Sequence, residues 1–115
     1  MLDDAINNYK KAIEINPSYV NAYNNLGNAY NELGNIDSAI VIFNQSLAIN
    51  PDNAGTYNNL GNALINKGEI DKAIINFKKA IEINPNDANA FNNLGIAQSN
   101  KNSVEDAIDS FKRAI

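Results

Sequence analysis

Asparagine is the residue whose number and spacing in this chain point to chemistry. It accounts for 24 of the 115 residues, and one subset recurs at helical spacing in three corresponding stretches. That subset is Asn21, Asn24, Asn25, Asn28, Asn58, Asn59, Asn62, Asn89, Asn92 and Asn93. A carboxamide offers one acceptor and two donors, so it can pair with both the C=O and the N–H of a backbone amide. A row of carboxamides therefore predicts a surface that binds an extended peptide by its main chain.

The residues that most often carry out catalysis are missing from the sequence. The chain contains no His and no Cys, which removes the usual general base, the usual nucleophile pairs and the commonest metal ligands. Carboxylate pairs such as Asp3 and Asp4 fall in the first turn of a predicted helix, where they complement the helix dipole. We therefore expect no enzymatic activity, no catalytic residue, no metal site and no cofactor.

The charge of the chain excludes several classes of partner. The formal net charge is −4 and the isoelectric point is about 4.6, whereas binding to nucleic acid or to an anionic membrane needs a basic face. The N-terminus lacks the pattern of a signal peptide, and no apolar stretch approaches the roughly 20 residues of a membrane helix. We expect a cytoplasmic protein by default, with a protein or peptide segment as its partner.

A repeat of 34 residues organises the sequence and must position the asparagines. Prolines and glycines recur at this interval, at Pro17, Pro51, Pro85, Gly27, Gly61 and Gly95. A fixed period of this size is typical of a solenoid of stacked units, which works by presenting a long surface rather than by housing a catalytic pocket.

Each repeat is predicted to contain two helices. In residues 20–53, apolar residues follow a helical period up to Leu33, and Gly34-Asn35 then breaks the helix. Asn35 is predicted to be the N-cap of the next helix. A second apolar stripe begins at Ile36 and ends at Asn50-Pro51. We call these the A helix and the B helix of the repeat. Glycine inside the A helix costs about 1 kcal/mol relative to Ala, so its recurrence at one phase predicts a partner helix that approaches too closely for a side chain.

The small and aromatic residues in fixed phase resemble the tetratricopeptide repeat. In the third unit the matching residues are Tyr57, Leu60, Gly61, Leu64, Ala73, Phe77, Ala80 and Pro85. The resemblance implies an all-α, right-handed superhelical solenoid of seven helices in a single array, 1–115. Residues 2–19 are expected to hold the B helix of a partial repeat, 20–53 and 54–87 to be full repeats, and 88–115 to be the last helix pair.

In tetratricopeptide arrays the A helices line the concave groove, so the resemblance implies that the asparagines lie in it. The arrangement is similar to the array of O-linked N-acetylglucosamine transferase, in which two rows of asparagines grip substrate peptides. The positions in phase with those rows are Asn25, Asn59, Asn93, Asn28 and Asn62, with Ile96 interrupting the second row. The carboxylate clamp of co-chaperones would instead need Lys or Arg where Asn24, Asn89 and Asn93 stand.

Two other interpretations remain open at the level of sequence. Because Asn is also abundant away from the A helices, a drift in composition would place carboxamides in the groove without any function. The terminal segments 2–12 and 104–115 lack a polar capping helix, which predicts exposed apolar ends. The chain is then either a fragment of a longer array, such as the targeting arm of a transferase, or a module that forms a dimer or polymer through its terminal helices.

Overall fold

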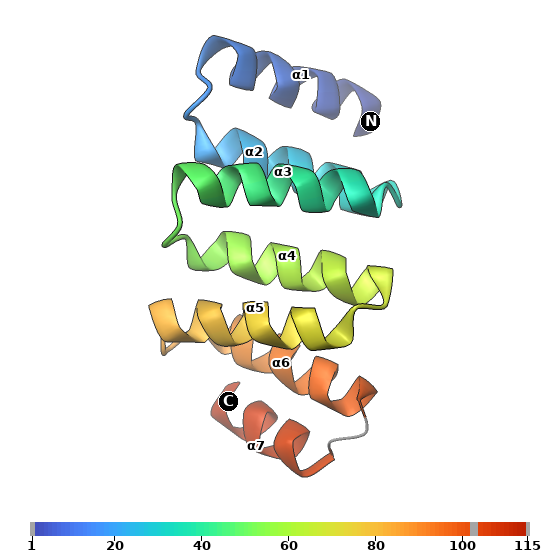
Figure 1. Cartoon of the computed structure of the whole chain (residues 1–115), viewed down its shortest axis with the longest axis vertical. Helices are drawn as coiled ribbons and strands as arrows, with labels where there is room; N and C mark the ends of the chain where they lie inside the picture. The colour runs from blue at the N-terminus through green and yellow to red at the C-terminus, as the bar shows by residue number, and fades with distance from the viewer. Residues whose placement is uncertain (1, 102–103, 115) are drawn as a thin grey trace. The chain divides into compact units, whose positions relative to one another are not determined.

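The computed structural model describes residues 2–101 and 104–114, and within these ranges the chain forms seven helices and no strand (Figure 1). The helices are α1 (Leu2–Ile15), α2 (Val20–Glu32), α3 (Ile36–Ile49), α4 (Ala54–Lys67), α5 (Ile70–Ile83), α6 (Ala88–Asn100) and α7 (Val104–Ala114). They divide into two compact units, with α1 to α3 in Met1–Asp52 and α4 to α7 in Asn53–Ile115. None of the described helices has the length and apolar character needed to span a membrane.

The predicted breaks between helices are confirmed, with one local difference. Gly34 and Gly68 follow α2 and α4 with φ angles of +84° and +89°, a left-handed conformation that glycine adopts without strain. Asn35 lies at the N-cap of α3 but its side chain makes no capping hydrogen bond there. In contrast, the side chain of Asn53 caps α4 by accepting a hydrogen bond from the Thr56 N–H.

The B helices end at Asn-Pro turns that the asparagine side chain stabilises. The Oδ1 atoms of Asn16, Asn50 and Asn84 accept hydrogen bonds from the backbone N–H two residues later, at 3.2, 3.2 and 3.4 Å. An Asn side chain that bonds its own backbone in this way is typical of an Asx turn. These three asparagines therefore have a local structural role, and a drift in composition is not needed to explain them.

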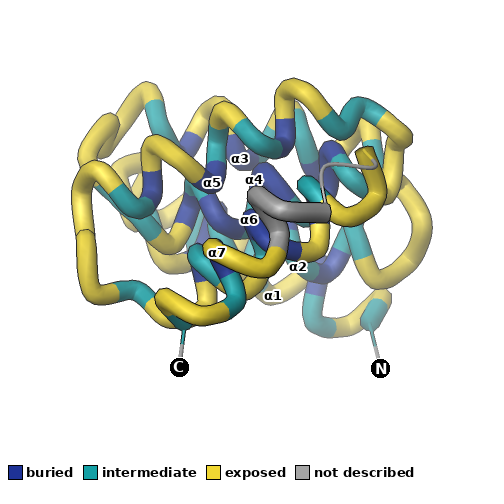
Figure 2. Tube along the Cα trace, turned by 90° about the horizontal axis from the view of Figure 1, so that it is seen from below, coloured by how far each residue is buried: buried dark blue, intermediate teal, exposed yellow. Residues whose placement is uncertain are grey.

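Unit 1 is built around α2, which packs against α1 on one side and α3 on the other. Ile6, Leu26 and Ala29 form a buried cluster between α1 and α2. The ring of Phe43 from α3 lies over Gly27 of α2, where a Cβ atom would be only 2.4 Å from Cε1 of the ring. Figure 2 shows buried stretches alternating with exposed ones along the helices, as expected for helices that pack through one face.

Unit 2 repeats the same pairing of an A helix with a B helix. α4 packs against α5 and α6 against α7, while α6 also packs against α5 and α4. Phe77 lies over Gly61 and Phe111 over Gly95, and a Cβ atom on these glycines would approach ring atoms to 2.5 and 2.7 Å. The predicted close approach at the recurring glycine is thus confirmed, and the group that approaches is an aromatic ring of the B helix.

Candidate functional site

Eight of the ten predicted asparagines have carboxamides that are available for a ligand. Within residues 2–101 and 104–114, their side chains form no hydrogen bond to the rest of the chain. Four are exposed on the A helices, namely Asn21, Asn25, Asn89 and Asn92. The other four are half-buried, namely Asn28, Asn59, Asn62 and Asn93. We call the surface formed by these eight residues the asparagine face of the A helices. In both units, carboxamides supply most of the hydrogen-bonding groups on this face.

The remaining two predicted asparagines occupy one register and are engaged inside the units. Asn24 of α2 accepts a hydrogen bond from the Ser46 Oγ of α3 at 2.9 Å. Asn58 of α4 is only 9% exposed, and its Nδ2 donates to the Asp87 Oδ2 at 2.9 Å. The other carboxylate oxygen of Asp87 accepts from the Ala90 N–H at the start of α6. Asn58 therefore connects α4 to the N-cap of α6, a role that helical spacing alone does not reveal.

The Oδ1 atom of Asn58 differs from the Nδ2 atom of the same carboxamide in its hydrogen bonding. The Oδ1 atom is buried and has no hydrogen-bond partner within the part of the chain that the structure describes. A buried acceptor without a donor costs about 1–3 kcal/mol, unless a bound water or a ligand N–H supplies one.

In unit 1, two of the available asparagines line a hollow between α1 and α2. The hollow has a volume of about 230 Å³. Its lining residues are Leu2, Ala5, Tyr9, Asn25, Asn28, Ala29 and Glu32. The α1 side contributes apolar surface and a phenol, while the α2 side contributes carboxamides and a carboxylate. The sequence places these α1 residues in the exposed terminal segment 2–12, but it does not predict that they face the asparagines of α2.

In unit 2, the available asparagines lie on two helices in contact. α4 carries Asn59 and Asn62, α6 carries Asn89, Asn92 and Asn93, and the two helices pack directly against each other. The structure thus brings the helices that carry the second and third of the three predicted stretches together within this unit.

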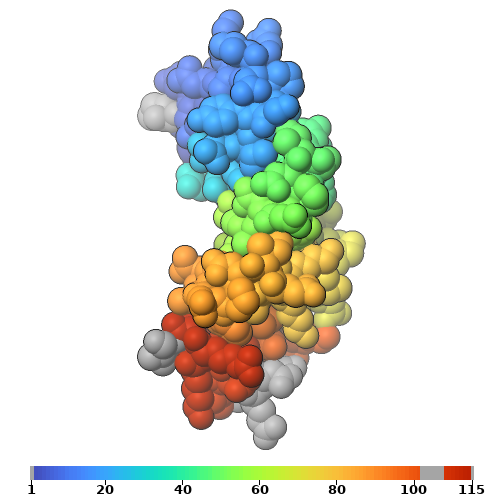
Figure 3. Space-filling view, turned by 90° about the vertical axis from the view of Figure 1, so that its left-hand side faces the viewer, coloured from blue at the N-terminus to red at the C-terminus, as the bar shows by residue number. Residues whose placement is uncertain are grey.

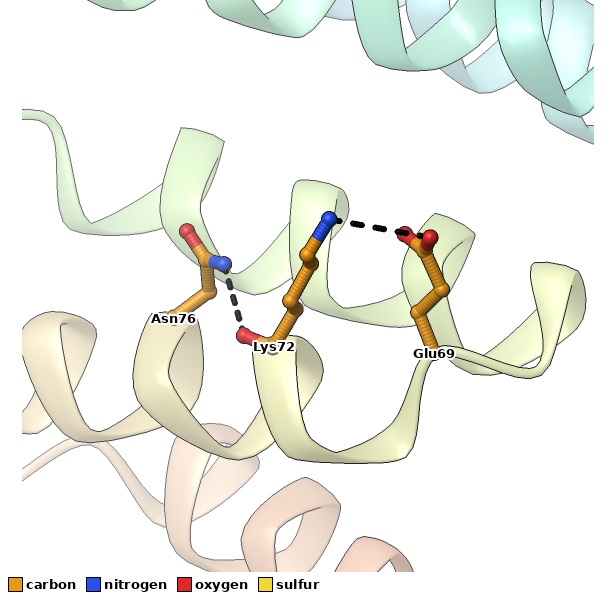
Figure 4. A network of polar contacts seen from close by, with 3 residues as sticks. All are labelled: Glu69, Lys72 and Asn76. Carbon is orange, nitrogen blue, oxygen red and sulfur yellow. Dashed lines mark hydrogen bonds and ion pairs between the residues drawn. The ribbon is translucent and has the colours of Figure 1, made fainter.

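A second hollow, with a volume of about 390 Å³, lies in unit 2 between the N-terminal end of α5 and the C-terminal end of α6. Lys101 forms an ion pair with Asp71 there, and the Lys72 Nζ lies 3.6 Å from the Glu69 Oε1 (Figure 4). Asn76, also drawn in Figure 4, donates from Nδ2 to the Lys72 backbone carbonyl at 2.8 Å. These groups are largely exposed and satisfy one another, and exposed ion pairs contribute at most about 1 kcal/mol.

Groups suited to metal binding do not gather in the described structure. Among residues 2–101 and 104–114, no group of three or more His, Cys, Asp or Glu side chains is placed to hold an ion. The predicted self-association segment at 104–115 falls partly on Ile115 and on the side chains of residues 104–107, which lie outside the described residues.

Comparison with known proteins identifies the family. A family model described as TPR repeat matches residues 2–34, 27–68 and 61–102. A search of curated proteins found no significant match. Among solved structures, the chain is similar to "Crystal structure of MamA", with 32% identity over 98% of this chain and 66% of that one and a TM-score of 0.89. It is also similar to "MamA MSR-1 C2", with 27% identity over 98% and 65% of the two chains and a TM-score of 0.81.

The chain thus spans just under two thirds of the length of these MamA chains. The matches confirm the predicted fold class, an all-α solenoid of tetratricopeptide repeats, and they support a role in protein–protein interaction. The chain belongs to the tetratricopeptide repeat family.

Proposed function

We propose that this chain is a protein-interaction scaffold that binds an extended peptide segment through the asparagines of its A helices. The observation that carries the proposal is that eight carboxamides on these helices make no hydrogen bond within residues 2–101 and 104–114 and are at least partly exposed. Asn side chains that serve the fold elsewhere in the chain, at the turns and at the α4 N-cap, are engaged locally. We also propose that the repeats of this scaffold run over 20–53, 54–87 and 88–115.

The strength of such a site follows from the number of hydrogen bonds. Each neutral hydrogen bond contributes a net 0.5–1.5 kcal/mol or so, and four in series contribute about 2–6 kcal/mol before the cost of ordering the peptide. The binding is then weak for a short peptide and increases with the number of carboxamides engaged. Because the contacts are to main-chain groups, the peptide's sequence matters little, apart from residues that cannot extend or that lack an N–H, such as proline.

Binding rather than catalysis is the function that the residue types support. The chain has no His or Cys, and the polar groups of the candidate face are carboxamides, which do not ionise near neutral pH and so cannot serve as general acids or bases. The cations of a carboxylate clamp are also missing, because Asn stands at 24, 89 and 93. The partner is thus an extended main chain rather than an acidic peptide end.

The experiment that tests this function compares two triple variants of the full chain. Binding of a random-sequence peptide library is measured for the wild type, for Asn25/Asn59/Asn93→Ala and for Asn7/Asn8/Asn44→Ala. The control asparagines are exposed and lie on B helices. We expect loosely related extended peptides to be enriched by the wild type and by the control variant, and to be lost with the A-helix variant.

Two results would contradict the proposal. One is that the wild type enriches no peptide, and the other is that both triple variants enrich the same peptides equally. Either result would favour the alternative of self-association through the terminal helices, for which Ile108 of α7 is notable because it is 50% exposed. Sedimentation over a range of concentrations measures that alternative directly.

A further inference from the structure

Ile96 of α6 is an aliphatic residue at a register that carries asparagine in the other two A helices. Asn28 of α2 and Asn62 of α4 stand at this register. Ile96 is 42% exposed. A single exposed aliphatic side chain is common on a protein surface, so the groups that surround Ile96 matter more than its exposure.

The neighbours of Ile96 on the surface of α6 are polar, and most of them are carboxamides. Residues three and four positions apart lie side by side on a helix. Asn92 and Asn93 therefore flank Ile96 toward the start of α6, and Ser99 and Asn100 flank it toward the end. All four are exposed or half-buried. Figure 3 shows the turn that leads into α6 (orange) at the surface of unit 2. Ile96 is thus an apolar point within a band of hydrogen-bonding groups.

A residue at this register stays accessible when a neighbouring A helix is in place. Asn62 is half-buried rather than buried, although α6 packs against α4, the helix that carries Asn62. Asn28 of unit 1 is half-buried as well. A side chain at this register is therefore within reach of a ligand in both units.

We propose that Ile96 gives the peptide site a preference for an apolar side chain at one position of the bound peptide. This inference rests on the proposed function, because it assigns a specificity to that same site. In an extended chain the side chains stand above and below the strand, while the backbone N–H and C=O groups point sideways. A peptide that crosses α6 at Ile96 directs one side chain onto Ile96 and its amides toward Asn93 on one side and Asn100 on the other.

The preferred side chain is aliphatic or aromatic. Ile96 offers no hydrogen bond, so a polar side chain placed against it would lose water without gaining a partner. When about 50 Å² of apolar surface is removed from water in this contact, a peptide with the apolar side chain binds about five- to tenfold more tightly. The other positions of the peptide keep the loose sequence requirements of main-chain binding.

The test selects random-sequence peptides on four forms of the full chain, namely wild type, Ile96→Asn, Ile96→Ala and Ile75→Asn. We expect the wild type to enrich peptides with an apolar residue at one position, by about five- to tenfold over a polar one. Ile96→Asn should bind peptides without this preference, and Ile96→Ala should weaken it. Because Ala is a good helix former, the second variant shows that the change is not caused by loss of α6. Ile75→Asn is the matched control, since Ile75 is 53% exposed on the B helix α5, and it should keep the preference.

Asn62→Ile provides the converse test within unit 2. The axes of helices in contact lie about 8–10 Å apart, and an extended chain advances about 3.4 Å per residue. Side chains that point the same way are separated by an even number of residues. We therefore expect Asn62→Ile to add a second apolar preference, about two or four positions from the first.

The inference and the proposed function fail in different ways. Peptides that are enriched without an apolar preference, or with one that Ile96→Asn leaves intact, would overturn the role of Ile96 while the asparagine face stands. A preference that Ile75→Asn also removes would overturn it too, because the apolar contact would then not be specific to α6. A wild type that enriches no peptide would overturn the asparagine face and this inference with it.

Discussion

Replacing Gly61 by alanine tests the ring-and-glycine contact that organises each helix pair. A Cβ at Gly61 would lie 2.5, 2.8 and 2.9 Å from three atoms of the Phe77 ring. Phe77 is fully buried, so its ring cannot move out into solvent to make room. Overpacking of this kind costs about 1–3 kcal/mol, and three close atoms place it near the upper end. Ala is a better helix former than Gly by about 1 kcal/mol, so the expected net loss of stability is about 2 kcal/mol.

Urea unfolding followed by circular dichroism measures this loss. For an m-value of about 2 kcal/mol per M, the midpoint should fall by about 1 M while the m-value stays constant. Gly55→Ala is the matched control on the same helix, because the only nearby atom is the Asn53 Oδ1 at 3.3 Å. Its stability should equal that of the wild type or exceed it by up to about 1 kcal/mol, because the helix preference of Ala acts there without a ring contact.

A double-mutant cycle identifies the cause. Phe77→Leu removes the ring, so Gly61→Ala should cost at least 1 kcal/mol or so less in that background than in the wild type. The reasoning is refuted if Gly61→Ala is neutral or stabilising, or if the two substitutions are additive. Either result would mean that the Phe77 ring does not approach Gly61 of α4 as closely as the structure shows.

Three further substitutions are expected to change stability in the same unfolding assay. Asp87→Ala removes the α6 N-cap and the acceptor of the Asn58 Nδ2, and should cost about 2–3 kcal/mol; Asp87→Asn should recover roughly half of this, and equal losses would contradict the capping role. Gly68→Ala should cost about 1 kcal/mol through its φ of +89° alone, because a Cβ there meets nothing within 4 Å; an unchanged midpoint would argue against the left-handed cap. Lys79→Gln should cost about 0.5 kcal/mol by loss of the contact with the Tyr57 ring. This cost should be smaller in high salt, because salt screens an exposed electrostatic pair.

The fold could be predicted closely because its signals are local and repeated. Gly34 and Gly68 end their helices in the predicted left-handed conformation, and the Asn-Pro turns end the B helices. The fixed phase of Gly61 predicts a close contact, and the structure identifies the contacting group as the Phe77 ring. Asn35 differs because an N-cap position is set by the backbone, whereas its hydrogen bond depends on the side-chain rotamer.

The candidate site was less predictable, because identical residues at identical phases have different neighbours. Asn24 and Asn58 are drawn into contacts with Ser46 and Asp87, while Asn92 at the same phase is exposed and leaves its carboxamide available. Ser46 is specific to its repeat, since Ala80 stands at the same register. A periodic pattern averages over such differences, so it predicts the face on which an asparagine lies but not the partner that its side chain finds.

The glycine under each aromatic ring has a consequence for how the chain forms during its synthesis. An A helix carries a central glycine and several asparagines, and an isolated helix of its length, 13 or 14 residues, is marginal in water. It gains its stabilising contact only when the ring of the following B helix has left the ribosome, about half a repeat later along the sequence. Order in the nascent chain should therefore advance in steps of a helix pair rather than helix by helix. A translational pause would expose the most unfolded chain when it falls between the two helices of a repeat.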